Sequence, residues 1–211
     1  MAHIYDAVLK PGKMELISAW LPQAPWFTGT APVTVEPVGS FRFDDPEGQV
    51  GIETHLVAVG TDVFQVPLTY RGAPLPGADD FLITTMEHSV LGRRWVYDAC
   101  GDPVYAQALA GAILAAEGQA RQCLEKDGAE VELPADVRVT GSGLPDGGEL
   151  AEGPGRPPAD LGISTLRTGD WQLAVVRMLE LEGETAPDPS LTAEWDGQDI
   201  PVVLAWAVPT Q

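Results

Sequence analysis

Residues 41–71 read FRFDDPEGQVGIETHLVAVGTDVFQVPLTYR, and this stretch decides the fold. Apolar and polar side chains alternate in three runs, which is the period of β-strands with one buried face. Asp45-Pro46-Glu47-Gly48 places proline and glycine where a type I turn needs them, and Gly60-Thr61-Asp62 separates the second run from the third. We therefore predict an antiparallel meander of three strands whose apolar face requires a cover.

The expected cover lies just before the meander. Residues 13–21 place Met14, Ile17 and Leu21 at i, i+3 and i+7, which is the spacing of an amphipathic helix. Pro22 follows directly and ends the pattern. We expect this helix to pack on the apolar face of the meander.

The remainder of the chain predicts one more helix and a second β unit. Asp102-Pro103 supplies an N-cap followed by proline at the first helical position, and the helix is expected to reach about Glu117 and end at Gly118. Apolar runs at 161–166 and 171–179 and a hairpin over 191–206 predict a mostly antiparallel β unit. The intervening residues 141–160 are rich in glycine, proline and acidic residues, which is typical of a loop.

The charge narrows the classes of partner. The 211 residues include 12 basic and 31 acidic side chains, giving −19, of which −7 lies in residues 1–121 and −12 in residues 122–211. Such a chain lacks the basic face that nucleic acid or an anionic membrane requires, so we expect neither. A basic protein partner fits the acidic half better.

Targeting and cysteine signals indicate a cytoplasmic protein. The N-terminus has no basic start followed by an apolar run, and no stretch approaches the length of a membrane span. Cys100 and Cys123 are too few and too widely separated for a disulfide framework, so two reduced thiols are expected.

Three motifs carry a resemblance to a known family. WLPQAPWF at 20–27, VPLTYR at 66–71 and Asp98 ahead of the second helix resemble the N-terminal cap of actinobacterial maltokinases, and most closely stand-alone proteins built on that cap. The resemblance implies an α+β fold with a cystatin-like cap, a curved antiparallel sheet packed on a helix. It also implies a link to maltose, trehalose and α-glucan metabolism. We accordingly divide the chain into a cap-like domain, 1–121, and a mostly β subdomain, 122–211.

The chemistry of those kinases resides in a lobe that follows the cap, and we expect this chain to end at Gln211 before one could begin. Neither the catalytic-loop and DFG motifs of kinases nor a P-loop occurs in the sequence. No cofactor is therefore predicted, and phosphoryl transfer by this chain alone is not expected.

One candidate site lies on the predicted meander. Glu53 and His55 share a strand face, and Arg42 and Arg71 are expected on the same polar face of neighbouring strands. These four groups could form a pocket in which His55 acts as a base and an arginine holds an anion. The alternative is a solvated sheet face with cross-strand charge pairs.

A second candidate set lies between residues 87 and 95. His88, Arg93 and Arg94 could bind an anion or a partner, since guanidinium groups suit carboxylates and phosphates. The alternative is that both arginines pair with some of the 31 acidic residues. The three histidines follow no metal-binding spacing, so no metal site is predicted. The six tryptophans fall mostly in apolar runs, which favours core packing over sugar stacking.

The leading hypothesis is a non-catalytic, cap-like binding or regulatory protein linked to maltose, trehalose or α-glucan metabolism. It would bind a protein partner, a second copy of itself or a carbohydrate. Two alternatives remain open: a small-molecule enzyme that uses the Arg42, Glu53, His55 and Arg71 face, and a carbohydrate-binding module.

Overall fold

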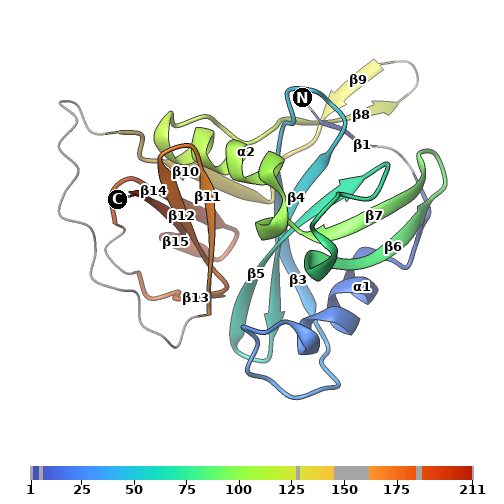
Figure 1. Cartoon of the computed structure of the whole chain (residues 1–211), viewed down its shortest axis with the longest axis horizontal. Coiled ribbons are helices and arrows are strands. Elements are labelled where there is room, and N and C mark those ends of the chain that lie inside the picture. Colours follow the sequence, from blue (N-terminus) through green and yellow to red (C-terminus); the bar gives the residue numbers. More distant parts are fainter. Residues whose placement is uncertain (1, 5–6, 127–128, 145–161, 184–186, 211) are drawn as a thin grey trace.

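The computed structural model describes residues 2–4, 7–126, 129–144, 162–183 and 187–210. Within these residues the chain forms three sheets and two α-helices, and the pairing is antiparallel apart from one parallel strand pair. The largest sheet curls around the N-terminal helix, and the second sheet stands beside it (Figure 1). The predicted α+β class with a curled antiparallel sheet therefore holds, whereas the finer cystatin-like topology stays a prediction.

The curled sheet has seven strands. Six of them run in the spatial order β2 (Leu9–Lys10), β6 (Leu82–His88), β7 (Gly92–Asp98), β5 (Asp62–Arg71), β4 (Gly51–Val59) and β3 (Glu36–Phe43), and β13 (Met178–Leu179) pairs with β5. Strands β3, β4 and β5 are the predicted meander, and the Gly48 amide closes its first turn on the Asp45 carbonyl.

The second sheet has five antiparallel strands. Their spatial order is β10 (Val137–Gly141), β14 (Ser190–Trp195), β15 (Gln198–Pro209), β12 (Trp171–Val176) and β11 (Ile163–Thr168). A small third sheet joins β1 (Ala2–Ile4), β8 (Gln122–Lys126) and β9 (Ala129–Glu132). The sequence predicted the hairpins of the second sheet but none of the strands of the third.

The pairing register of the meander buries both of its faces. Arg42 lies opposite Glu53, and Glu53 lies opposite Leu68. The apolar side chains of β5 consequently share a face with Glu53 and His55 rather than with Ile52. Glu53 is only 4% exposed and His55 is buried with it. The expectation of a solvated polar face is therefore wrong.

Helix α1 (Lys13–Trp20) covers one face of the curled sheet, as predicted. Leu16 and Ile17 are buried against Val57, Val66 and other apolar side chains of β4 to β7. The helix continues into a 3₁₀ turn, η1 (Leu21–Gln23), which contains the proline that ends its regular hydrogen bonding. Burial of this apolar stripe fixes the N-terminus of α1 beside β4, where Lys13 contacts Glu53.

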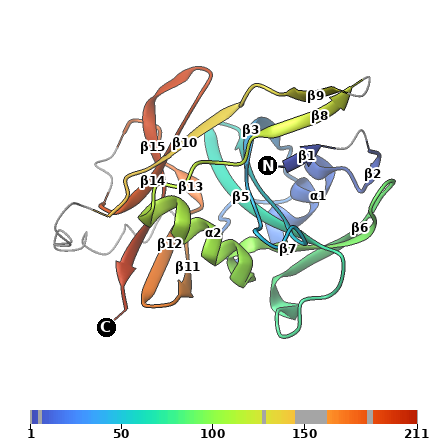
Figure 2. The same cartoon turned by 90° about the horizontal axis from the view of Figure 1, so that it is seen from above.

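Helix α2 (Pro103–Leu114) lies between the two sheets (Figure 2). Asp102 caps it as predicted, by accepting a hydrogen bond from the Val104 amide. The helix ends earlier than expected, and Ala116 rather than Gly118 takes the left-handed conformation. The reason is that the amides of residues 143 and 144, which follow β10, bond to the carbonyls of residues 113 and 114 and replace the next helical turn.

One buried arginine marks the place where the chain passes between the sheets. Strand β12 belongs to the five-stranded sheet and β13 to the curled sheet, so the predicted single strand over 171–179 is divided at Arg177. The Arg177 amide donates to the Gly162 carbonyl, and its carbonyl accepts from the Gln65 amide, both at 2.8 Å. The two sheets are therefore joined at Arg177 through backbone and side chain.

The main apolar core contains residues from both sides of residue 121, for example Phe41, Ile52 and Leu109 together with Leu173 and Leu204. The division at residue 121 stays a prediction. The loop expected over 141–160 lies largely outside the described residues, because only 141–144 belong to them. Among the described helices, none has the length and apolar character that crossing a membrane demands.

Candidate functional site

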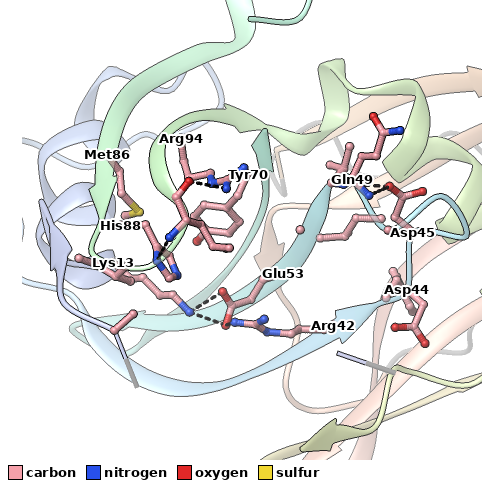
Figure 3. Close-up of a pocket in the computed structure, with 18 residues that line it drawn as sticks. Lys13, Arg42, Asp44, Asp45, Gln49, Glu53, Tyr70, Met86, His88 and Arg94 are labelled. Carbon is pink, nitrogen blue, oxygen red and sulfur yellow. Dashed lines mark hydrogen bonds and ion pairs between the residues drawn. The ribbon is translucent and has the colours of Figure 1, made fainter. Parts of the chain in front are cut away.

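A cavity of about 440 Å³ lies beside the N-terminus of α1, where strands β3 to β7 each contribute to its wall. Figure 3 shows the side chains that line it, and most of those labelled are charged or polar. These labelled residues are Lys13, Arg42, Asp44, Asp45, Gln49, Glu53, Tyr70, Met86, His88 and Arg94. The cavity unites members of both predicted sets, Arg42 and Glu53 from the first and His88 and Arg94 from the second.

Glu53 is the centre of the ion pairs in this pocket. Its carboxylate oxygens accept hydrogen bonds from the Lys13 ammonium at 2.6 and 2.9 Å, and Arg42 Nη2 lies 3.2 Å from Oε1. The cross-strand register places Arg42 directly opposite Glu53, and the first residue of α1 brings Lys13 over them. One carboxylate is thus matched by two cations.

These neighbours fix the charge of Glu53. Burial acts to raise the pKa of this carboxyl, but His55, Lys13 and Arg42 outweigh it and hold the pKa well below its usual value of 4.5. Tyr70 is affected in the opposite direction, because burial and the Glu53 charge raise the pKa of its phenol well above 10.0. At neutral pH the pocket therefore contains an ionised Glu53 and a neutral Tyr70.

His55 forms a layer behind the pocket and does not line it. Its Nε2 lies 3.4 Å from Glu53 Oε2 and 3.4 Å from the Tyr70 hydroxyl. The His55 side chain is buried, and Glu53 and Tyr70 lie between its ring and the cavity. A ligand in the cavity therefore meets Glu53 and Tyr70 first. The geometry gives His55 a supporting position under Glu53.

Arg71 is not part of this constellation. It follows Tyr70 on β5, so its side chain points to the opposite face of the sheet, and it forms two hydrogen bonds of 2.6 Å with Asp102, the N-cap of α2. The prediction that Arg71 shares a face with Arg42 is wrong, because the strand register places Leu68 and Tyr70, not Arg71, on that face.

Arg93 and Arg94 have different environments although they are neighbours on β7. Arg93 is exposed and pairs with Glu87 across the hairpin at 3.0 Å. Arg94 lines the pocket, and one of its terminal nitrogens donates to the Leu91 carbonyl at 2.6 Å. His88 also lines the pocket, and its Nδ1 accepts hydrogen bonds from the Val90 and Leu91 amides.

The opposite wall of the pocket is acidic and polar, with Asp44, Asp45 and Gln49 on the side away from Lys13, His88 and Arg94 (Figure 3). The Asp45 carboxylate accepts hydrogen bonds from three backbone amides, those of residues 47, 49 and 50. Those bonds hold the pKa of Asp45 below 3.8 against the opposing effect of burial. The cavity therefore has a cationic and an anionic end.

Lys13 and Tyr70 contact the Glu53 site, and the sequence did not single them out. Lys13 was expected only as the first residue of a helix, and its pairing with Glu53, 40 positions along the chain, depends on how α1 docks. Tyr70 ends the third alternating run of the predicted meander, and only the register shows that its face also contains Glu53. The one signal in the sequence was that a lysine begins the helix expected to pack on the meander, which contains Glu53.

The predictions about tryptophan stacking and metal binding can be compared with the residues that line the pocket. None of the six tryptophans lines it, and five of them pack in or against the two apolar cores, as their sequence context predicted: Trp20, Trp26, Trp171, Trp195 and Trp206. Within the described part of the chain, no group of three histidine, cysteine, aspartate or glutamate side chains is arranged to bind a metal ion.

Comparison with known proteins finds a family match for one part of the chain, and this part contains most of the pocket residues. No curated protein matches the sequence. Residues 20–102 match the maltokinase N-terminal cap domain family. This match confirms the resemblance carried by the WLPQAPWF and VPLTYR motifs, and over residues 20–102 the chain is similar to maltokinase N-terminal cap domains.

Proposed function

We propose that this protein is a non-catalytic, cap-like binding protein linked to maltose, trehalose or α-glucan metabolism, and that the Glu53 pocket is its ligand site. The match over residues 20–102 is the observation that carries this proposal. Arg42, Glu53, Tyr70 and Arg94 all line the pocket and all belong to that stretch. The finer features expected from the resemblance, a cystatin-like cap and a cytoplasmic location, belong to the same proposal.

The state of Glu53 supports binding rather than catalysis. A general acid must be protonated near neutral pH, and a general base must accept a proton readily. Glu53 does neither, because Lys13 and Arg42 keep its carboxylate ionised and occupy its oxygens. His55 lies behind it and is not in the cavity wall. The enzyme hypothesis therefore loses His55 as its proposed base. It also loses Arg71, one of its two candidate anion-binding arginines, because Arg71 is hydrogen-bonded to Asp102.

A cavity of about 440 Å³ is within the range of small-molecule sites, which favours a ligand in a pocket over a flat carbohydrate-binding platform. Tryptophan stacking has no support at this site, since no tryptophan lines it. The ligand would instead meet the ring of Tyr70 and the polar groups at the two ends of the cavity.

The test combines a turnover assay with binding measurements on the purified chain. Incubation with ATP and maltose, followed by ³¹P NMR, is expected to show no phosphoryl transfer. Isothermal titration calorimetry with maltose and with trehalose is expected to show millimolar binding of at least one sugar. Robust turnover, or no heat of binding with either sugar, would overturn the proposal.

Two neighbouring exposed residues provide a matched pair of variants for this test. Leu91 lies at the pocket wall, whereas Val90 precedes it and does not line the cavity. Leu91→Trp should narrow the pocket and weaken sugar binding, and Val90→Trp should leave it unchanged. Equal effects of the two substitutions would place the sugar elsewhere on the protein.

A further inference from the structure

Arg94 differs from most of the described arginines of this acidic protein. Six other arginines have a carboxylate within 2.6 to 3.9 Å: Arg42, Arg71, Arg93, Arg121, Arg138 and Arg177. Among the residues that the structure describes, Arg94 and Arg167 have no carboxylate at such a distance, although the chain has 31 acidic side chains. Arg167 is exposed, whereas Arg94 lines the pocket. A guanidinium that lines a pocket and pairs with no carboxylate of the protein is a candidate for binding an anion from outside.

Two buried donors in the pocket wall lack hydrogen-bond partners. These are the Nε groups of Arg94 and Arg42, and both residues line the cavity. A buried polar group without a partner costs free energy, so such a group in a native pocket needs an explanation. The bond from an Arg94 terminal nitrogen to the Leu91 carbonyl orients the guanidinium in the pocket wall, whereas Nε is covered in this structure.

The charges around Arg94 make this end of the cavity positive. Lys13 and Arg42 together exceed the single charge of Glu53. Among the described residues of the wall, the other carboxylates are Asp44 and Asp45, which lie at the far end (Figure 3). Burial and the positive charges of Arg94 and Lys13 lower the pKa of His88 below 6.5. This ring is therefore neutral at pH 7 and does not change the charge of this end of the cavity.

We propose that the ligand of the Glu53 pocket carries an oxyanion, a phosphate or a carboxylate, which the Arg94 guanidinium binds, with Lys13 beside it. The opposite end, with Asp44 and Gln49, offers acceptors for hydroxyl groups of the same molecule. This inference rests on the proposed function only in placing the ligand at this pocket. It adds the chemical class that the pocket selects.

The experiment measures binding of inorganic phosphate and of succinate by isothermal titration calorimetry at constant ionic strength. Arg94→Gln keeps hydrogen-bonding groups but removes the charge, and Arg93→Gln is the matched control on the same strand. We expect Arg94→Gln to weaken anion binding by about tenfold to a hundredfold, because charge-assisted hydrogen bonds are lost. Arg93→Gln should leave binding within twofold of the wild type.

The outcomes separate this inference from the proposed function. The anion that binds more tightly, phosphate or succinate, identifies the kind of oxyanion that the pocket prefers. Loss of that binding in Arg94→Gln supports the inference whichever anion it is. Equal losses in the two variants, or no binding of either anion by a wild-type protein that is folded, would overturn it. If maltose then still binds and Leu91→Trp abolishes that binding, the proposed function stands and only the oxyanion assignment fails.

Discussion

The Arg177–Asp98 pair gives the sharpest prediction about how the protein is held together. Arg177 is 0% exposed, and its Nη2 donates to both Asp98 oxygens at 2.7 and 2.8 Å. Its Nε donates to the Ser164 hydroxyl at 2.8 Å, and the guanidinium lies 4.8 Å from the centre of the Trp26 ring. Asp98 and Trp26 belong to the cap-like stretch, whereas Arg177 and Ser164 belong to the second β unit.

Replacing Asp98 by alanine leaves a buried guanidinium without its counter-charge. Removing one partner of a buried ion pair costs about 3–5 kcal/mol, whereas an exposed pair contributes about 0–1 kcal/mol. For a chain of this size that loss corresponds to a decrease in Tm of about 6–20 °C. The exposed Arg93–Glu87 pair supplies the control, and Glu87→Ala is expected to lower Tm by only a few degrees.

The measurement is urea unfolding followed by far-UV circular dichroism for the wild type and both variants. Asp98→Leu combined with Arg177→Met should recover much of the lost free energy of unfolding, because the buried charge is then absent. A cost for Asp98→Ala no larger than that for Glu87→Ala would refute the view that this pair joins the cap-like stretch to the second β unit.

Three further predictions concern the pocket and the buried thiol. Because the pKa of Glu53 is lowered on folding, its carboxylate stabilises the protein above its usual pKa of 4.5, and this contribution is lost as the pH falls through the depressed value. The free energy of unfolding should therefore decline below about pH 4.5, less steeply in Glu53→Gln, and parallel pH profiles would contradict this. Gly72→Ala places a Cβ 2.9 Å from an Arg94 terminal nitrogen, so we expect weaker phosphate binding by calorimetry with little change in Tm. Unchanged affinity would show that the position of Arg94 is unimportant. Burial raises the pKa of Cys100 to about 12, so iodoacetamide at pH 8 should leave it unmodified in the native protein and alkylate it in urea, as mass spectrometry of the peptides would report.

Local sequence patterns predicted strands β3, β4 and β5 of the curled sheet but not β2, β6 or β7, because alternation and turn residues act over a few positions. The meander, α1 and the start of α2 all follow from such patterns. The pattern within each strand could not specify which faces pair, because a register shift of one residue exchanges the two faces. The burial of Glu53 and His55 therefore became visible only in the pairing of Glu53 with Leu68.

The candidate site was predictable where it depended on neighbouring strands. Arg42 and Glu53 were expected together and are paired across β3 and β4. Arg71 was misplaced by the same register error, and Lys13 was missed because helix docking brings it to the pocket from a distant part of the chain. The different environments of Arg93 and Arg94 follow from strand alternation, but the sequence did not say which one faces the cavity.

The central claim is that a small ligand occupies the Glu53 pocket and binds the Arg94 guanidinium, which has no paired carboxylate among the described residues. The most direct test is the ¹H–¹⁵N spectrum of the arginine Nε groups, with the Arg94 signal assigned by its loss in Arg94→Gln. On titration with phosphate, we predict that the Arg94 signal shifts and saturates while the Arg93 signal stays in place. Equal, non-saturating shifts of both signals, or no shift of the Arg94 signal, would contradict the account.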